Sequence, residues 1–382
     1  MLNALAISGY RSLKDVVLSL GQLNVVTGAN GSGKSSLYRS LRLLADIGSG
    51  NLIASLAREG GLTSTLWAGP EMISDAMDPE PTIRKKPISL QLGFASDEFC
   101  YSIDLGLPTP SSSAFSLDPV IKRECLWRGT TMRPSTLWTD RHGPVVKCRD
   151  ADGEWTSLSI NQPTFASVVT EFADPQRSLD LMVLRELLRS WRFYDHMRTD
   201  REAPARQLQV GTYSPVLAED GGNLAAALQT VREIGDGPAL DEAISDAFPG
   251  SRLQIDTTQG RFEVMLKQPG LLRALRAAEL SDGTLRYLLL LAALTSPRPP
   301  ELLVLNEPET SLHPDLIQPL GRLIASRVGS SQIIVVTHSL ALADALSSRS
   351  SCFSIRLEKV AGATRLSGEN SYGVPAWKWP SR

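Results

Sequence analysis

Residues 28–35 carry the sequence Gly-Ala-Asn-Gly-Ser-Gly-Lys-Ser, which fits the pattern G-x-x-x-x-G-K-[ST] at every fixed position. The apolar residues 23–27 come directly before it and predict a short buried strand. Apolar residues at helical spacing follow it as far as residue 45. With glycine at about 7% of residues, the pattern arises by chance in roughly one chain of this length in a hundred. A strand, a glycine-rich turn and a helix therefore predict a phosphate-binding loop.

The phosphate contacts are expected from the loop backbone and from two side chains. Glycine permits backbone conformations in which successive N–H groups face an anion, and the following helix adds its positive end. Lys34 can reach the β- and γ-phosphates, and the Ser35 hydroxyl can bind Mg²⁺. The residues assigned to the nucleotide here are Gly28, Ala29, Asn30, Gly31, Ser32, Gly33, Lys34, Ser35 and Ser36.

The composition limits the classes of protein to which a chain with this loop can belong. Of the 382 residues, 42% are hydrophobic and 21% charged, which is typical of a globular chain. A formal net charge of −2 provides no overall attraction to nucleic acid or to an anionic membrane. The first residues lack the features of a signal peptide and no apolar run reaches the length of a membrane span, so we expect a cytoplasmic protein with no membrane partner.

The four cysteines are widely separated in the sequence, at positions 100, 125, 148 and 352. None forms a C-x-x-C pair, so the sequence indicates neither a zinc site nor a disulfide framework. We expect buried free thiols.

The predicted secondary structure changes character along the chain. Residues 86–150 alternate polar and apolar residues, as half-buried antiparallel strands do. An amphipathic helix is expected over 179–194, followed by helices over 224–234 and 240–248. In the last third, apolar strands alternate with helices, which favours a parallel sheet covered on both faces.

Several downstream motifs can complete a nucleotide site. An apolar strand runs into Asn306 and Glu307, where a group supporting Mg²⁺ and a carboxylate that polarises water are expected. His338 stands at the tip of the strand predicted over 332–337. Ser281 and Gly283 precede a helix and can offer a hydroxyl and free N–H groups to an anion.

Together these motifs resemble those of the ABC-type ATPases of the RecF/SMC superfamily, and are similar to the bacterial single-chain ATPases called RecF-like. Residues 281–286, SDGTLR, resemble the signature motif of that group. Residues 306–314, NEPETSLHP, resemble its Walker B motif and D-loop, and His338 resembles its switch histidine. Residues 10–13 and 191–194 are also similar to this group, so the resemblance covers nearly the whole chain.

The resemblance implies a fold and a domain scheme. The expected fold is an α/β ABC-type P-loop NTPase head with a mostly parallel core sheet, an antiparallel β region and a helical lobe. One head would span residues 1–382, with its nucleotide-binding core formed by 1–60 and 251–382. The antiparallel region would span 86–150, and the helical lobe 165–250.

The resemblance also implies a mechanism that uses ATP and Mg²⁺. Two heads enclose two ATP molecules, so Ser281 and Gly283 of one chain would contact the nucleotide held by the other. Glu307 would be the general base and His338 would sense the γ-phosphate, with Lys34 as the third catalytic group. Arg11 is assigned to the nucleotide because it lies in the opening motif. ATP binding would close this homodimer, and hydrolysis would open it.

Asn306 departs from the aspartate that many relatives carry at this position, although asparagine is familiar in the RecF-like subgroup. Asparagine keeps the shape of the side chain and loses its charge, so Mg²⁺ affinity falls unless a water-mediated contact survives. We predict slow hydrolysis, because Lys34, Ser35 and Glu307 are all present. No spacing rule selects between Gln162 and Gln176 for the Q-loop glutamine.

The six arginines between 185 and 206 lie among aromatic residues, a pattern that suits a DNA contact as well as a solvated surface with local ion pairs. Interleaved acidic residues favour the ion-paired surface. His196 and His313 have no ligand partners at metal spacing, so we expect structural or capping roles.

Two functions follow from the ATPase prediction. The first couples ATP hydrolysis to DNA repair, of the double-strand break or recombination type, or to DNA maintenance, and its DNA component is implied by the resemblance alone. The second is an ATP-gated signalling or phage-defence switch that acts through a protein partner without touching DNA. A transporter subunit fits less well, because the signature differs from the glycine-rich transporter form.

Overall fold

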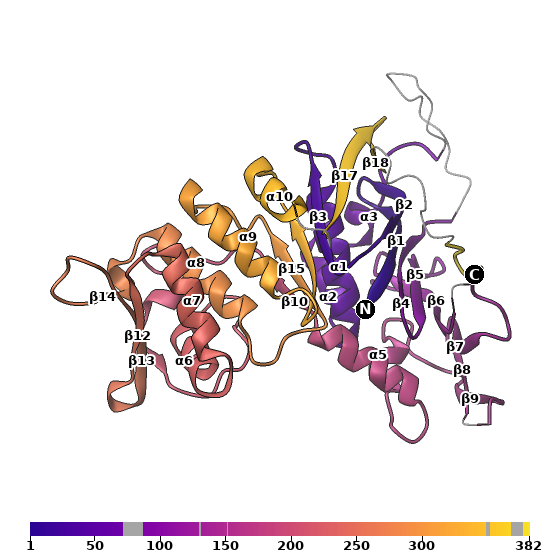
Figure 1. The fold of residues 1–382 in the computed structure, drawn as a ribbon. Helices are drawn as coiled ribbons and strands as arrows, with labels where there is room; N and C mark the ends of the chain where they lie inside the picture. The colour runs from indigo at the N-terminus through magenta and orange to yellow at the C-terminus, as the bar shows by residue number, and fades with distance from the viewer. Residues whose placement is uncertain (72–86, 130, 151, 349–351, 368–376) are drawn as a thin grey trace. The chain divides into compact units, whose positions relative to one another are not determined.

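The computed structural model describes residues 1–71, 87–129, 131–150, 152–348, 352–367 and 377–382 (Figure 1). The chain forms two compact units. Unit 1 comprises Met1–Gly21, Val26–Trp191 and Ile355–Arg382, and unit 2 comprises Gln22–Val25 and Arg192–Ser354. The chain passes from one unit to the other before Gln22, inside strand β3 (Leu23–Gly28), before Arg192, and inside strand β17 (Cys352–Val360).

Unit 1 is built on an eight-stranded antiparallel sheet with the order β2-β1-β4-β5-β6-β7-β8-β9. Its strands are β1 (Leu2–Tyr10), β2 (Leu13–Ser19), β4 (Leu90–Ser96), β5 (Cys100–Gly106), β6 (Val120–Trp127), β7 (Leu137–His142), β8 (Val145–Arg149) and β9 (Trp155–Ser159). Strands that are neighbours in sequence form antiparallel pairs from β4 onward. The N-terminal hairpin extends this sheet, since β1 pairs with both β2 and β4.

The helices of unit 1 gather around α1, which follows the glycine-rich loop. They are α1 (Lys34–Gly48), α2 (Leu52–Arg58), α3 (Leu62–Thr65), α4 (Val168–Glu171) and α5 (Leu179–Ser190). Helices α1 and α5 approach closely at Gly48, where an added Cβ would lie 2.8 Å from the Cβ of Leu188. The last strands of the unit, the greater part of β17 and β18 (Ala363–Leu366), form an antiparallel pair.

Unit 2 contains a parallel arrangement of β10 (Arg192–Tyr194), β15 (Leu302–Asn306) and β16 (Gln332–Val336). The first residues of β3 lie beside β16, where the N–H of Ile333 donates to the carbonyl of Gln22 at 2.8 Å. Strand β16 is buried along its whole length, as expected for a parallel strand covered on both faces. The carboxyl ends of β15 and β16 therefore lie side by side.

The rest of unit 2 is helical, with a small antiparallel sheet. Its helices are α6 (Leu224–Ile234), α7 (Gly237–Ala247), α8 (Asp282–Leu294), α9 (Ile317–Ser326) and α10 (Leu340–Ser347). Its remaining strands are β11 (Gln209–Val210), β12 (Arg252–Asp256), β13 (Arg261–Lys267) and β14 (Leu275–Arg276), and its 3₁₀ turns are η1 (Pro204–Arg206), η2 (Thr258–Gly260), η3 (Ala277–Glu279) and η4 (Pro314–Leu316). Helix α8 is buried continuously from Leu285 to Leu294, as a central helix must be, and it packs against α6 and α9.

The mixed α/β fold is confirmed, and the expected mostly parallel core sheet needs a correction. The parallel strands form the smaller sheet, and the largest sheet is antiparallel. Strands β1 and β2 belong to the antiparallel sheet, because their hydrogen-bonding partners are each other and β4.

The helix predicted over 179–194 is too long. Helix α5 ends at Ser190, and Trp191 takes an extended conformation with φ −61° and ψ 140°. Residues 192–194 form β10, in register with residues 303–305 of β15. Hydrogen bonds to the neighbouring strand β15 determine the conformation of residues 192–194 and override their helical pattern. The apolar face of the helix ends where the buried strand begins.

The segments of the expected domain scheme fall in both units. Residues 165–250 contribute α4 and α5 to unit 1 and α6 and α7 to unit 2. The grouping of these segments into one functional head stays a prediction.

Two expectations from composition can be compared with the structure. All four cysteines carry free thiols; Cys100, Cys125 and Cys148 are buried, and Cys352 is partly buried. Burial raises the pKa of each of these thiols, to about 12 for Cys125. In the described part of the chain, no helix combines the length and the apolar character needed to cross a bilayer.

Candidate nucleotide site

The glycine-rich loop of unit 1 is confined by the strands at the end of the chain. Gly28 has a φ of 153°, and a Cβ added there would lie 2.3 Å from the carbonyl oxygen of Leu357. Gly33 has a φ of 109°, and its added Cβ would lie 2.2 Å from Oγ1 of Thr364. Both the backbone angles and the space therefore demand glycine, which explains two of the fixed positions of the loop pattern.

Thr364 is a contact of the loop that the sequence analysis did not identify. Its hydroxyl donates to the carbonyl of Ser32 at 2.8 Å and lies 2.8 Å from the hydroxyl of Ser12. Its backbone N–H donates to the Ser12 carbonyl at 2.7 Å. Strand β18 thus joins the loop to the turn between β1 and β2, although more than 300 residues separate them in the sequence.

The loop offers polar groups to an anion. The ammonium of Lys34 donates to the carbonyls of Gly28 and Ala29, at 2.6 and 3.1 Å, so this buried side chain lies along the loop. The hydroxyl of Ser32 is buried and has no hydrogen-bond partner. Helix α1 has no acidic residue in its first turn and no side-chain cap at Gly33. A buried hydroxyl without a partner and a positive helix end fit the phosphates of a nucleotide.

The other residues of unit 1 that are predicted to bind the nucleotide are wholly or partly exposed or are paired with other side chains. Ala29, Asn30, Gly31 and Ser35 are exposed, and Ser36 is partly exposed. Arg11 is held by Glu59, with an ion-pair distance of 2.7 Å, and its N–H donates to the carbonyl of Thr65. Its assignment to the nucleotide stays a prediction.

In unit 2, the chain turns sharply as it leaves β15. Glu307 has a φ of 47°, and its N–H donates to the carbonyl of Val336 at the end of β16 at 2.7 Å. A left-handed conformation in a residue with a side chain costs of order 1–3 kcal/mol, and such strain is common at functional sites. The turn leaves the carboxylate of Glu307 43% exposed, with one oxygen 3.5 Å from Nδ1 of His338.

Glu309 holds the end of β16 in place, a role that the sequence analysis did not assign. Its Oε1 accepts hydrogen bonds from the Thr337 hydroxyl at 2.5 Å and from the N–H groups of His338 and Ser339 at 3.3 and 3.2 Å. The same oxygen lies 3.5 Å from Nδ1 of His338, and Oε2 is buried without a partner. The second glutamate of the NEPE sequence thereby brings Glu307 and His338 together.

Asn306 lies at the end of β15 beside the carboxylate of Asp195, the residue that follows β10. Its Nδ2 donates to Oδ1 of Asp195 at 2.8 Å. Because an ionised carboxylate only accepts hydrogen bonds, the amide nitrogen must face Asp195 and the amide oxygen is directed away from it. Asp195 therefore orients Asn306 and adds the negative charge that Asn306 lacks. Sequence analysis could not pair these residues, which are 111 positions apart.

These groups line a cavity of about 270 Å³ within unit 2. It is lined by Asp195, His196, Met197, Arg198, Thr199, Arg286, Asn306, Glu307, Thr310 and Ser311. Oxygen donors from Asn306 and Asp195 suit Mg²⁺, which usually takes few protein ligands and keeps several waters. Among the described residues, no group of three or more His, Cys, Asp and Glu side chains could hold a metal ion.

The predicted signature motif lies at the start of α8. Ser281 caps the helix by accepting a hydrogen bond from the N–H of Thr284 at 3.2 Å. A Cβ on Gly283 would lie 2.8 Å from the carbonyl of Ser311, so glycine permits the predicted D-loop to approach the helix.

Arg286, the last residue of SDGTLR, connects α8 to the predicted Walker B segment. It donates to the carbonyls of Asp195, Met197 and Glu307 at 3.0, 3.1 and 3.4 Å. Burial lowers the pKa of this guanidinium. The structure thus brings the start of α8, where the signature motif is predicted, close to Asn306 and Glu307 within unit 2.

The arginine-rich stretch agrees with the ion-paired interpretation. Arg185 pairs with Glu186, and Arg198 pairs with Asp200 at 2.7 Å. Arg206 is buried and contacts Asp282. Of the two histidines, His313 caps η4 as expected, and His196 is exposed.

The strand, glycine-rich loop and helix of unit 1 define a P-loop protein. The chain belongs to the family described as "AAA domain, putative AbiEii toxin, Type IV TA system", whose model matches residues 23–344.

Solved structures of SMC heads resemble the fold. The chain is similar to an SMC head crystallised with the C-winged helix domain of ScpA, with 14% identity and a TM-score of 0.52 over 96% of this chain and 97% of that one. It is also similar to an SMC head with an extended coiled coil, bound to the C-terminal domain of ScpA derived from Pyrococcus furiosus, with 14% identity and a TM-score of 0.50 over 96% and 95%. At this identity the likeness describes the fold. No curated protein sequence matches the chain.

Proposed function

We propose that this protein binds and slowly hydrolyses Mg·ATP and that ATP drives the formation of a homodimer. The arrangement of Glu307 and His338 carries the proposal. A strained turn exposes the Glu307 carboxylate, and the buried Glu309 places His338 beside it at 3.5 Å. A carboxylate held in this way can accept a proton from an attacking water.

Each predicted group has a defined task in this proposal. The loop backbone and Lys34 hold the phosphates, and Ser35 and Asn306 hold Mg²⁺. When bound, Mg·ATP supplies the phosphoryl group and the cation that balances its charge. Asp195 would keep the Asn306 amide oxygen available to the cation, and Glu307 would take the proton of the attacking water.

The homodimer proposal concerns Ser281 and Gly283. Ser281 is exposed at the N-terminus of α8, so its hydroxyl is available to the nucleotide of a second chain. Contacts of this kind in both directions would enclose two ATP molecules, as the resemblance to SMC-type heads implies.

The dimer can be tested by sizing the Glu307→Gln variant with and without Mg·ATP. We expect a dimer with Mg·ATP and a monomer without it, because the variant binds ATP and does not consume it. The matched control is Glu307→Gln combined with Lys34→Ala, which should stay monomeric. A monomer at saturating Mg·ATP would contradict the proposal. Binding of duplex DNA, measured in parallel at low salt, tests the coupling to DNA repair or maintenance.

A protein-directed switch is the second candidate, and the family description favours it. That description names a putative toxin of a type IV toxin–antitoxin system. The net charge of −2 and the ion-paired arginines of the 185–206 stretch also provide little attraction for DNA. An ATP-dependent dimer that binds no DNA but retains a defined protein partner would support the switch. Salt-dependent DNA binding that strengthens with ATP would support the DNA function.

Asp195 provides a test of the metal site. We expect Asp195→Asn to raise the Mg²⁺ concentration needed for nucleotide binding by about 10- to 100-fold. Loss of a partner that orients a metal ligand typically weakens metal affinity by this factor. The measurement is the Mg²⁺ concentration needed for half-maximal binding of a fluorescent ATP analogue. The control is Asp200→Asn, in the same segment with an exposed side chain, which should leave this concentration unchanged. An equal response of the two variants would contradict the role of Asp195.

A further inference from the structure

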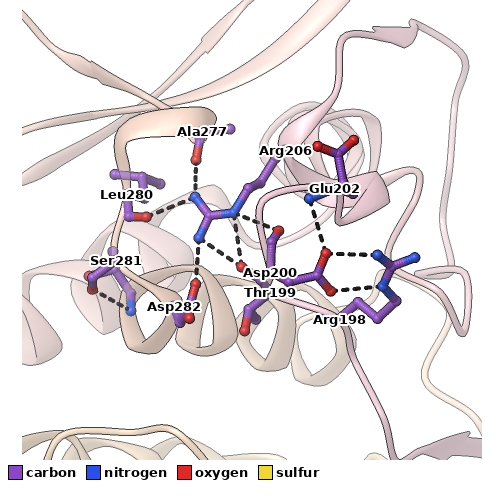
Figure 2. Close-up of polar contacts among 10 residues, drawn as sticks. Arg198, Thr199, Asp200, Glu202, Arg206, Ala277, Leu280, Ser281 and Asp282 are labelled. Carbon is purple, nitrogen blue, oxygen red and sulfur yellow. Dashed lines mark hydrogen bonds and ion pairs between the residues drawn. The ribbon is translucent and has the colours of Figure 1, made fainter.

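Arg206 lies at the end of η1 and connects two segments that are distant in sequence. Its guanidinium is nearly fully buried, with 6% of the side chain exposed. Figure 2 shows its nitrogens directed at the turn that precedes α8. Nη1 donates to the carbonyls of Ala277 and Leu280 at 2.7 and 2.8 Å, and Nη2 lies 2.7 Å from Oδ1 of Asp282.

The acceptors of Arg206 surround Ser281. Ala277 and Leu280 lie before it and Asp282 follows it, and these three residues are bound by one planar, rigid group. Because Leu280 is adjacent to Ser281, fixing its carbonyl limits the backbone rotation that would reorient the serine. The hydrogen bond from Thr284 to Ser281 completes the restraint.

The other side of the guanidinium holds the segment in which Arg206 itself lies. Nε and Nη2 donate to the carbonyl of Thr199 at 2.9 and 2.8 Å, and Nε also donates to Asp200 at 3.1 Å. Upstream, this segment begins at Asp195, which binds Asn306. Arg206 therefore connects the turn before α8 to segment 195–206, which is itself attached to the end of β15 through Asp195 and Asn306.

We propose that Arg206 is a positioning residue that holds Ser281 in the geometry needed to contact the nucleotide of a second chain. This inference rests on the proposed ATP-dependent dimer. A buried guanidinium that uses all three nitrogens on backbone carbonyls and one carboxylate cannot contact nucleotide itself. Its effect passes through the turn formed by residues 277–282.

Two substitutions separate positioning from general stability. Arg206→Met removes every donor, whereas Arg206→Lys keeps the charge and part of the hydrogen bonding. In the Glu307→Gln background, we expect Arg206→Met to weaken ATP-driven dimerisation by about 10- to 100-fold, the equivalent of losing one hydrogen bond to a charged group. Arg206→Lys should retain part of the dimer. Arg201→Met, an exposed neighbour, is the matched control.

Nucleotide binding by the monomer provides a measurement that a general folding defect would change. We expect Arg206→Met to bind a fluorescent ATP analogue as tightly as its parent, because the phosphate loop lies in unit 1 and is intact. Faster hydrogen exchange should be confined to the amides of residues 277–286. Loss of nucleotide binding, or faster exchange throughout unit 2, would assign Arg206 to stability and overturn the proposal.

A mixing experiment tests the action on the second chain. Lys34→Ala has a defective loop and an intact signature, and Arg206→Met has the reverse. A mixed dimer contains one site built from the two intact halves, so the mixture should hydrolyse ATP faster than the sum of the separate variants. No gain on mixing would overturn the inference. Failure of the Glu307→Gln parent to dimerise would instead refute the proposed function, so the two failures can be told apart.

Discussion

Replacement of Glu307 by glutamine is expected to lower the rate of ATP hydrolysis by about 10²- to 10⁴-fold, the usual contribution of a general base. Glutamine preserves the size of the side chain and removes its ability to accept a proton. ATP binding should stay close to that of the unchanged protein, because Lys34 and the loop lie elsewhere in the chain. The measurement is phosphate release under saturating Mg·ATP, together with the dissociation constant for the nucleotide.

The matched control for this prediction lies at the opposite end of the same strand. Glu301 is exposed just before β15, and Glu301→Gln removes the same charge without touching the site. Its turnover should equal that of the unchanged protein. If Glu307→Gln hydrolyses ATP at the unchanged rate, another group activates the water and the role assigned to Glu307 is wrong.

Local sequence patterns predicted the parts of the site that depend on neighbouring residues. The strand, loop and helix around residues 23–48 are confirmed, as are strands β15 and β16. The helix after Ser281 is also confirmed, and it begins at Asp282 because the serine hydroxyl caps it. These elements need only periodicity, glycine and a capping residue, all of which are visible in a short window of sequence.

The missed features depend on contacts between distant segments. Asp195 directly follows residues 192–194, which the sequence pattern predicts as a continuation of the amphipathic helix. Only the pairing of these residues with β15 makes them a strand, and that strand brings the Asp195 carboxylate to Asn306. Thr364 lies on a four-residue strand whose role comes from contact with the loop. Arg206 belongs to an arginine-rich stretch whose sequence favours an ion-paired surface, but its guanidinium is buried against the carbonyls of Ala277 and Leu280. No local rule selects these residues.

The structure also contains a buried charge cluster in unit 1 that should have a large effect on stability. Glu124 on β6 and Arg141 on β7 are both fully buried, and their charged groups approach at 3.4 Å. The Glu124 carboxylate also accepts hydrogen bonds from the hydroxyls of Tyr101 and Ser167, at 2.7 and 2.5 Å, and from the N–H of Val168 at 3.0 Å. Burial raises the pKa of Tyr101, which therefore keeps its proton and remains a donor.

Glu124→Ala is expected to destabilise the protein by about 3–5 kcal/mol, the usual cost of removing one partner from a buried ion pair. The substitution leaves the guanidinium of Arg141 buried without a countercharge and three donors without their acceptor. The measurement is the shift of the urea midpoint at constant m-value. Asp180→Ala is the control, because its ion pair with Arg128 is partly exposed and should contribute less than about 1 kcal/mol.

The double variant Glu124→Leu with Arg141→Met distinguishes the buried charge from the loss of packing. Removing both charges eliminates the uncompensated guanidinium, so the double variant should be more stable than Glu124→Ala alone. Arg141 also donates to the carbonyls of Pro163, Ala166 and Gly143, so part of the loss should remain. A double variant that is less stable than Glu124→Ala would show that these backbone contacts, which connect β7 to the start of α4, outweigh the ion pair.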